Sequence, residues 1–187
     1  MLVLQNDSKN IDGNFLEWCT AVLNSLCSCD EPVFLAFVEE PLKNELGRKV
    51  SGAYVKFNNE GIPVSIMFID DVCDEMKVLE AIIHEYAHHL SQEGHDGKLF
   101  RLFYEFLYKE GMQIMLPEEK IKERITEYEK RLVEFLNSET SNLFQNHLVA
   151  LDRDIVALSL LYETLEQTPP SDVIDVIDKL KVKCQKL

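Results

Sequence analysis

The sequence predicts an α+β protein in which a domain with a small sheet, residues 1–115, precedes an all-helical extension, residues 116–187. Three observations predict this class. Short runs rich in β-branched and aromatic residues occur in the first part. Apolar residues recur every three to four positions in longer stretches of both parts, as on amphipathic helices. From residue 116 onward no strand pattern appears, so the extension is expected to be a helical hairpin or bundle.

The first part begins with a predicted helix over residues 14–26, in which Phe15, Cys19, Val22, Leu23 and Leu26 share one face. The apolar run of residues 32–38, PVFLAFV, predicts a buried strand. Residues 52–57 and 64–69 are two further β-rich runs. Because Asn58-Asn59-Glu60-Gly61 joins them, the two runs are expected to form a hairpin.

A long amphipathic helix is predicted after Asp70-Asp71, either of which can cap a helix N-terminus. Its apolar residues step by three and four: Val72, Met76, Leu79, Ile83, Ala87 and Leu90. Gly94 is the expected stop of this helix. Asp96-Gly97 can then open a further helix, which Gly111 is expected to end.

Three segments of the extension carry narrow apolar seams with a 4-3 spacing. Their residues are Ile121, Ile125, Tyr128, Leu132 and Phe135, then Phe144, Leu148, Leu151, Ile155, Leu158, Tyr162 and Leu165, and finally Val173, Ile177, Leu180 and Cys184. Helices with such seams pack on one another. Two interpretations stay open: a bundle within the chain, or burial against a second chain that gives a protein partner or a homo-oligomer.

Charge and chain start limit the expected partners. The net charge is −14, and residues 1–115 alone carry nine basic and nineteen acidic side chains. A nucleic-acid surface is therefore not expected, since phosphate binding needs clustered Lys and Arg. The start, MLVLQNDSKN, fits neither a signal peptide nor a membrane span, so the expected location is cytoplasmic, without a membrane partner.

The five cysteines form an odd set without a CxxC pair, which favours reduced thiols over a disulfide framework. Cys27-Ser-Cys29 could hold a metal ion. Nothing nearby in the sequence supplies a second pair of ligands, so ordinary half-buried thiols are the favoured interpretation.

Four of the five histidines lie in HEYAHHLSQEGH, residues 84–95. On a helix, His84 and His88 project from the same side, one turn apart, and flank the apolar stripe. Two imidazoles so placed can bind one Zn²⁺ at about 2.0–2.1 Å each. Glu85 is turned further round the helix and is expected to face the open coordination position. A carboxylate there can take a proton from water that zinc has acidified and pass it to a leaving amine, which predicts a hydrolase with Glu85 as the catalytic general base.

A catalytic zinc ion needs a third protein ligand, and His95 is the favoured residue because Gly94 lets the chain turn back before it. The predicted metal ligands are therefore His84, His88 and His95. Rivals for the third position are Glu93, Asp96 and Glu105. Asp96 could instead cap the next helix or accept the N–H of a ligand histidine.

His89 points about 100° away from His88 on the helix. It is expected to be a surface residue or one that contacts a metal ligand.

The stretch from residue 52 to residue 100 resembles the SprT-like family of zincin metallopeptidases. The residues that carry the likeness are Gly52, the strand end Ile69-Asp70, the helix end IIHEYAHHL, and the turn Gly94-His95-Asp96 with Phe100 after it. The resemblance implies a small zincin-like domain, a short mixed sheet with an active-site helix beneath it. It also implies zinc held by His84, His88 and His95, catalytic Glu85, and a peptide substrate that adds as a strand along the edge strand, residues 64–69.

Two function classes follow. The first is a zinc metalloprotease that cuts a protein or peptide substrate, with an extension that binds or restrains a partner. The second is a catalytically inactive zincin scaffold that acts as a protein-protein interaction module. Many SprT-like proteins carry a C-terminal zinc ribbon, and the absence of a CxxC pair here again argues against nucleic-acid work. Asp96 also stands where the family commonly has glycine.

Overall fold

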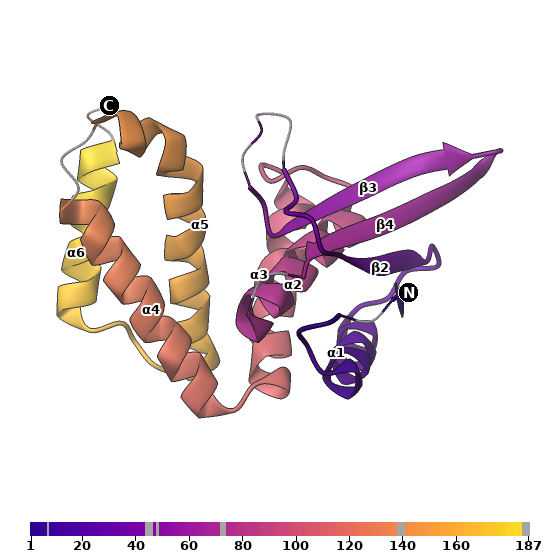
Figure 1. Cartoon of the computed structure of the whole chain (residues 1–187). Coiled ribbons are helices and arrows are strands. Elements are labelled where there is room, and N and C mark those ends of the chain that lie inside the picture. The colour runs from indigo at the N-terminus through magenta and orange to yellow at the C-terminus, as the bar shows by residue number, and fades with distance from the viewer. Residues whose placement is uncertain (7, 44–46, 48, 72–73, 138–140, 185–187) are drawn as a thin grey trace. The chain divides into compact units, whose positions relative to one another are not determined.

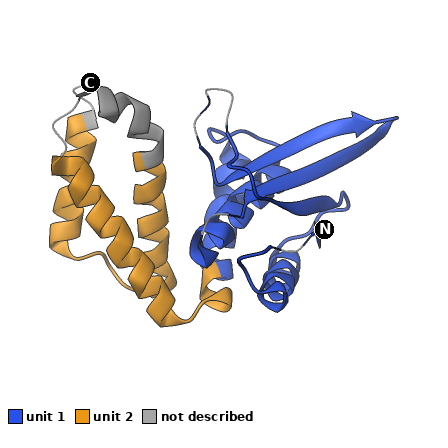
Figure 2. Ribbon diagram, in the orientation of Figure 1, with its two compact units in different colours: residues 1–111 blue, residues 112–187 orange. Residues whose placement is uncertain are grey.

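The computed structural model describes residues 1–6, 8–43, 47, 49–71, 74–137 and 141–184; within residues 141–150 and at residue 184 only the backbone is described. The fold is mixed α+β, with a four-stranded sheet and six helices in the described part of the chain. The chain divides into two compact units, Met1–Gly111 and Met112–Leu187 (Figure 2). The sheet lies in the first unit. Within the described ranges, no helix combines the length and apolar character that a membrane crossing requires.

The sheet contains β1 (Leu2–Leu4), β2 (Val33–Val38), β3 (Gly52–Asn59) and β4 (Ile62–Asp70) in the order β1-β2-β4-β3 (Figure 1). β1 pairs with β2 and β2 with β4 in parallel, whereas β3 and β4 are antiparallel. The strands predicted over residues 32–38, 52–57 and 64–69 are confirmed. β1 was not predicted, because three residues are too few to show a periodicity.

The predicted edge strand is wrong. β4 lies between β2 and β3, and β3 is the terminal strand. Pro63 is tolerated near the start of β4 because β2 pairs with β4 only from Ser65 onward, so the proline lies beyond the reach of β2. The β3–β4 hairpin therefore continues past the end of β2 (Figure 1).

The expected hairpin loop is confirmed at the turn between β3 and β4. Asn59 pairs with Ile62, and the two residues between them, Glu60 and Gly61, have φ of 52° and 88°. Two positive φ angles are the mark of the type I′ turn, which matches the twist of a two-residue hairpin. The Asn58 side chain also accepts a hydrogen bond from the Gly61 N–H at 2.7 Å.

One face of the sheet is buried. In β2 the burial alternates, with Val33, Leu35 and Phe37 inside and the residues between them half-buried. Met67 and Ile69 of β4 continue this inner face. α1 (Gly13–Leu26) packs near β1, and α2 (Glu75–Ser91) packs on β3 and β4.

The N-termini of α1 and α2 are each capped by an aspartate side chain. Asp12 accepts hydrogen bonds from the N–H groups of Asn14 and Phe15 at 2.8 and 3.1 Å. Asp74 accepts from the Lys77 N–H at 3.0 Å and caps α2, so the expectation that Asp70 or Asp71 does so is wrong. Asp70 still belongs to β4, and the Asp71 side chain accepts instead from the Lys9 N–H at 2.9 Å. Val72 of the predicted helix lies outside the described residues.

α3 (Lys98–Met115) runs through Gly111, which was expected to end it. The second unit contains α4 (Glu118–Asn137), α5 (Ser141–Thr164) and α6 (Ser171–Cys184), and α4 packs against both of the others. The seam residues buried in this unit are Ile121, Ile125, Tyr128, Leu132, Leu151, Leu158, Tyr162, Ile177 and Leu180. The side chains of Phe144, Leu148 and Cys184 lie outside the described residues. A buried Asp154 of α5 pairs with Arg131 of α4 at 2.6 Å.

Candidate metal centre

The site is built on the last two turns of α2. Ile83 and Ala87, on the apolar stripe of this helix, are fully buried and fix its rotation against the sheet. His84 and His88 lie beside this stripe and are half-buried. Their ring centroids are 5.0 Å apart, as expected for side chains separated by one helical turn.

The chain then turns back and brings a third histidine to the first two. α2 ends at Ser91, and Gln92 adopts a left-handed conformation with φ of 56°. The Nε2 atom of His95 lies 2.9 Å from Nε2 of His84 and 3.3 Å from Nε2 of His88. Tetrahedral zinc with ligands at about 2.05 Å separates its nitrogen ligands by about 3.3 Å; the spacing from His88 matches this value, and the spacing from His84 is somewhat shorter. Within the described part of the chain, this is the group of three side chains that could bind a metal ion.

Aromatic residues of α3 cover the histidine cluster. Phe100 stacks on the His88 ring at 4.2 Å with an interplanar angle of 24°, and its ring lies 5.4 Å from that of His95. Tyr104, one turn later, meets the His84 ring edge-on at 5.5 Å. Phe100 and Tyr104 are both buried. These contacts restrict the ring orientations of the histidines and exclude water from one side of the cluster.

The protonation of His88 suits a metal ligand. Burial lowers the pKa of His88 below its ordinary value of 6.5, and the nearby His95 lowers it further, whereas a hydrogen bond to the Glu93 carbonyl opposes the shift. That bond joins Nδ1 of His88 to the Glu93 oxygen at 2.8 Å. With the proton on Nδ1, the lone pair of Nε2 points to the cluster.

Glu85 follows His84 on α2 and is 7% exposed. The start of β3 lies against it: a Cβ atom built on Gly52 would be 2.9 Å from both Cγ and Oε1 of Glu85. The glycine therefore leaves the space that the Glu85 side chain occupies. Gly52, the first residue of the edge strand β3, therefore lies directly against the Glu85 side chain.

The rivals for the third ligand lie elsewhere. The Glu93 carboxylate accepts hydrogen bonds from the N–H groups of Leu99 and Phe100 at 2.8 and 3.2 Å, so it caps α3. The alternative that Asp96 caps this helix is not what the structure has. Asp96 and Glu105 are exposed, and neither belongs to the cluster of possible ligands.

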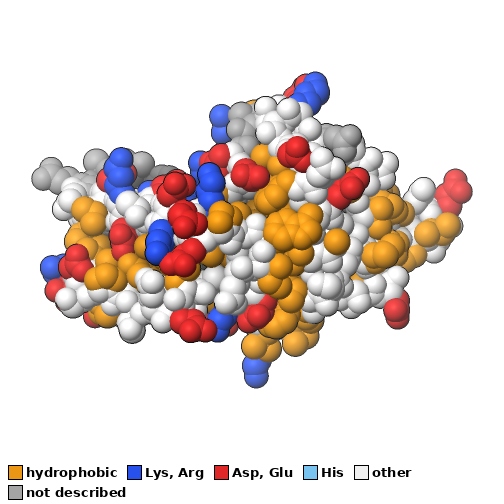
Figure 3. Space-filling model, turned by 90° about the horizontal axis from the view of Figure 1, so that it is seen from below, with side chains coloured by type: hydrophobic (Ala, Val, Ile, Leu, Met, Phe, Trp, Pro, Cys, Tyr) orange, Lys and Arg blue, Asp and Glu red, His pale blue; other side chains and the backbone are white. Residues whose placement is uncertain are grey.

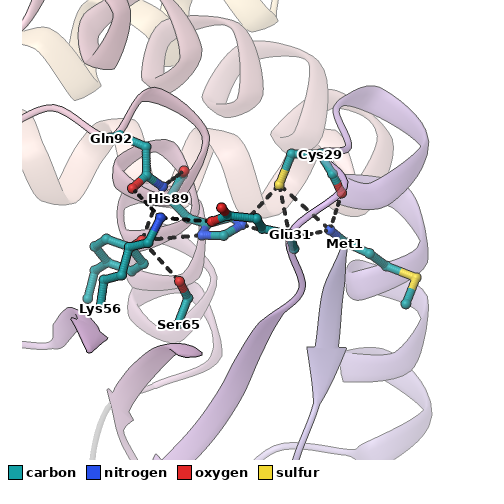
Figure 4. Close-up of polar contacts among 8 residues, drawn as sticks. Met1, Cys29, Glu31, Lys56, Ser65, His89 and Gln92 are labelled. Carbon is teal, nitrogen blue, oxygen red and sulfur yellow. Dashed lines mark hydrogen bonds and ion pairs between the residues drawn. The ribbon is translucent and has the colours of Figure 1, made fainter. Parts of the chain in front are cut away.

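His89 is neither a surface residue nor part of the cluster. It is 1% exposed, and its Nε2 lies 3.0 Å from Sγ of Cys29 and 3.1 Å from the carbonyl oxygen of Glu31. Nδ1 lies 3.4 Å from the Tyr54 hydroxyl. Figure 4 shows the ring between Cys29 on one side and the Lys56 side chain on the other. His89 thus joins α2 to the loop after α1 and to β3. Sequence spacing gave no signal for this contact, because Cys29 and His89 are 60 residues apart.

The thiols that the structure describes are not in disulfides: Cys19, Cys27 and Cys29 are free. Cys73 lies outside the described residues, as does the side chain of Cys184. Burial raises the pKa of Cys19 to about 12. The described part of the chain has no group of three metal-binding side chains around Cys27 and Cys29.

Comparison with known proteins gives no relative for this chain: no family model, no curated protein and no solved structure matches it.

Proposed function

We propose that the protein is a zinc-dependent metallopeptidase of the zincin type, similar to the SprT-like family, which hydrolyses peptide bonds of a protein substrate. One observation carries the proposal: the Nε2 atoms of His84, His88 and His95 converge with spacings of 2.9 and 3.3 Å. Three imidazoles suit zinc. Catalytic zinc sites use three protein ligands and keep a fourth position open, whereas structural sites are closed by four.

Each residue of the site has a separate role. The three histidines would hold the ion through Nε2, and zinc would supply Lewis-acid polarisation of a peptide carbonyl and of a water molecule. Glu85 accepts a proton from the attacking water on its carboxylate and transfers it to the leaving amine. The contact with Gly52 supports this role, since it limits the positions that the Glu85 carboxylate can take.

The substrate is proposed to bind as an extended peptide paired with β3. This strand forms the edge of the sheet, and its first residue touches the proposed general base. A peptide that adds to β3 would therefore pass beside Glu85. Main-chain hydrogen bonds to an edge strand supply affinity with little dependence on side-chain sequence, so unstructured segments of many proteins would be accepted.

A nucleic-acid substrate is not part of the proposal. The net charge of −14 opposes binding to phosphates. Figure 3 agrees with this for the face that it displays, where Lys and Arg side chains are interspersed with Asp and Glu and form no continuous basic patch.

The test compares zinc binding with proteolysis. Zinc-loaded protein is incubated with casein, an unstructured substrate, and the fragments are identified by mass spectrometry. Cleavage should stop on chelation and return with zinc. Glu85→Gln should keep wild-type zinc stoichiometry and lose about 10²- to 10⁴-fold in rate, the usual contribution of a general base. Glu17→Gln, at an exposed position of α1, is the matched control. Absence of zinc binding, or an unchanged rate in Glu85→Gln, contradicts the proposal.

Exposed apolar side chains of the second unit favour the alternative, a catalytically inactive scaffold that binds a protein partner. Val133, Ile174 and Val182 are 43%, 43% and 49% exposed, and Val133 lines a groove between α4 and α6. The same experiment separates the two functions. A scaffold would bind zinc without cutting casein, and Glu85→Gln would behave as the wild type. A peptidase whose second unit binds a partner would lose that partner, but no activity, on Val133→Ser.

A further inference from the structure

The loop between α2 and α3 carries His95 but little secondary structure. It begins at Gln92, whose N–H donates to the His88 carbonyl at 2.9 Å. One backbone bond closes a turn inside it, from the Gly97 N–H to the Gly94 carbonyl at 2.9 Å. Because His95 is exposed, burial alone does not hold it in place. Something else must keep its ring beside His84 and His88.

Glu93 makes contacts at both ends of this loop. Its carbonyl oxygen accepts the Nδ1–H of His88 at 2.8 Å. Its carboxylate reaches forward and accepts the N–H groups of Leu99 and Phe100, in the first turn of α3, at 2.8 and 3.2 Å. Its own N–H donates to the Ser91 hydroxyl at 3.2 Å. One residue therefore ties the end of α2 to the start of α3, on either side of His95.

The carboxylate replaces the cap that the sequence lacks. Gly97 directly precedes α3 and has no side chain to accept the first N–H groups of the helix. It also has to be small: a Cβ atom on Gly97 would overlap Oε2 of Glu93 and lie 2.5 Å from its Cβ and 2.9 Å from its Cδ. A negative charge at this end of α3 is further favoured by the helix dipole. Glu93 and Gly97 thus form a matched pair.

The capped turn of α3 also reaches the metal centre. Phe100, whose N–H binds the Glu93 carboxylate, stacks on the His88 ring at 4.2 Å and lies 5.4 Å from the His95 ring. Release of the carboxylate would loosen Phe100 and the loop that carries His95. It would also free the carbonyl that fixes the His88 ring.

We propose that Glu93 is a positioning residue for the metal centre: its carboxylate caps α3 and its carbonyl orients His88, so that the three imidazoles are held together before the ion binds. The inference rests on the proposed function only in that the histidines are taken to bind zinc. Glu93 itself does not touch the ion.

The first test measures zinc affinity of the full chain by competition with a chromophoric chelator. Residues that orient metal ligands typically contribute 10- to 100-fold to metal affinity. Glu93→Ala should therefore weaken zinc binding by about 10- to 100-fold. Glu93→Gln keeps an acceptor oxygen and should fall between Glu93→Ala and the wild type. The control is Glu17→Gln at an exposed position of α1, expected within about twofold of the wild type, as for surface substitutions in general.

The second test uses the Glu93–Gly97 pair as a cycle. Gly97→Ala should weaken zinc binding as Glu93→Ala does, because the new methyl group would overlap both Oε2 and Cβ of Glu93 and displace this side chain together with the loop backbone that carries it. In a Glu93→Gly background the same substitution should change the affinity by less than about twofold, since the side chain that it meets is gone. Equal effects of Gly97→Ala in both backgrounds would show that this position needs glycine only for its backbone conformation. That result would contradict the steric pairing of Gly97 with the Glu93 side chain.

A purely structural cap has a different signature. It would lower the unfolding temperature of zinc-free Glu93→Ala and leave the zinc affinity within about twofold of the wild type, which overturns the proposal. NMR of the zinc-free protein gives a readout that needs no metal. His88 should be protonated on Nδ1 in the wild type and should populate both tautomers in Glu93→Ala. Identical tautomers in the two proteins would also overturn it, whereas loss of zinc binding by the wild type itself counts against the proposed function instead.

Discussion

Replacement of Gly52 by alanine is expected to displace the Glu85 carboxylate and leave the fold intact. The new Cβ would lie 2.9 Å from Cγ and Oε1 of Glu85 and 3.2 Å from Cδ. Non-bonded carbon atoms prefer separations of about 3.5–4.0 Å, so the Glu85 side chain has to shift by about 0.6–1 Å. The atoms that have to move belong to the side chain of Glu85 and not to the backbone of α2. The free energy of unfolding should therefore change much less than the activity.

The size of the effect follows from this displacement. A misplacement of about 1 Å in a catalytic group can cost on the order of 100-fold in rate, which corresponds to about 2.7 kcal/mol of transition-state stabilisation. We expect kcat/KM of Gly52→Ala to fall by about this factor. Zinc affinity should be unchanged, since the clash falls on Glu85 and not on the three histidines.

The assay combines casein cleavage, zinc competition and thermal unfolding for four proteins: wild type, Gly52→Ala, Glu85→Ala and the double variant. Alanine at position 85 lacks Cγ, Cδ and Oε1, the three atoms that the new methyl group would meet. Gly52→Ala should therefore cause no further loss of activity in the Glu85→Ala background. Additive losses in the double variant, or full activity of Gly52→Ala, would refute the reasoning.

Three other results are expected. His95→Ala should bind zinc more than about 100-fold more weakly than the wild type, beyond the loss for a residue that only orients a ligand, and a chelator titration measures this; unchanged affinity would remove His95 from the site. Burial lowers the pKa of both His88 and His89. The unfolded state therefore binds more protons below about pH 6.5, and calorimetry of the zinc-free protein should show full stability above that pH and a falling unfolding temperature below it. A flat profile between pH 5.5 and 7.5 would contradict this. Iodoacetamide at pH 8 should label half-exposed Cys29 and spare Cys19, whose pKa burial raises to about 12; mass spectrometry of the labelled peptides reads the outcome, and labelling of Cys19 in the folded protein would show that its site opens.

Local patterns were enough to predict most elements of the fold. The hairpin turn could be predicted from the loop Asn58-Asn59-Glu60-Gly61. Its last two residues, Glu60 and Gly61, are the central residues of the turn and adopt positive φ angles. α2 and α4 follow from apolar residues at helical spacing, which tertiary packing then buries. His84 and His88 follow from the same period, since residues four apart share a helix face.

The order of the strands was beyond the reach of local pattern. Residues 64–69 and 52–57 are both β-rich, and pairing with β2 from Ser65 onward decides which strand becomes the edge. That pairing joins residues more than 30 positions apart and has no local signature. The residue that caps α2 could not be predicted either. Asp70, Asp71 and Asp74 all have a suitable side chain, and the choice depends on where β4 ends, which the local sequence does not reveal.

The supports of the site were also missed. Glu93 is four residues before Gly97 and acts as a cap from outside the helix, so the usual rule for a capping residue does not find it. The presence of glycine directly before α3 was the available signal, because it leaves the first N–H groups without a local acceptor. The burial of His89 depends on Cys29 and Glu31, which only the folded chain brings near.

Support along β3 is graded. Gly52, at one end, is wedged against a helix, whereas Phe57 to Asn59, at the other, are exposed and pair only with the start of β4, which β2 does not reach. A two-stranded ribbon without backing is marginally stable in water. The hairpin should therefore bend easily near its tip and hardly at all near the histidines. A peptide paired along β3 would therefore lie on a flexible ribbon at the end formed by residues 57–59 and on a firmly supported backbone at the Gly52 end, beside Glu85.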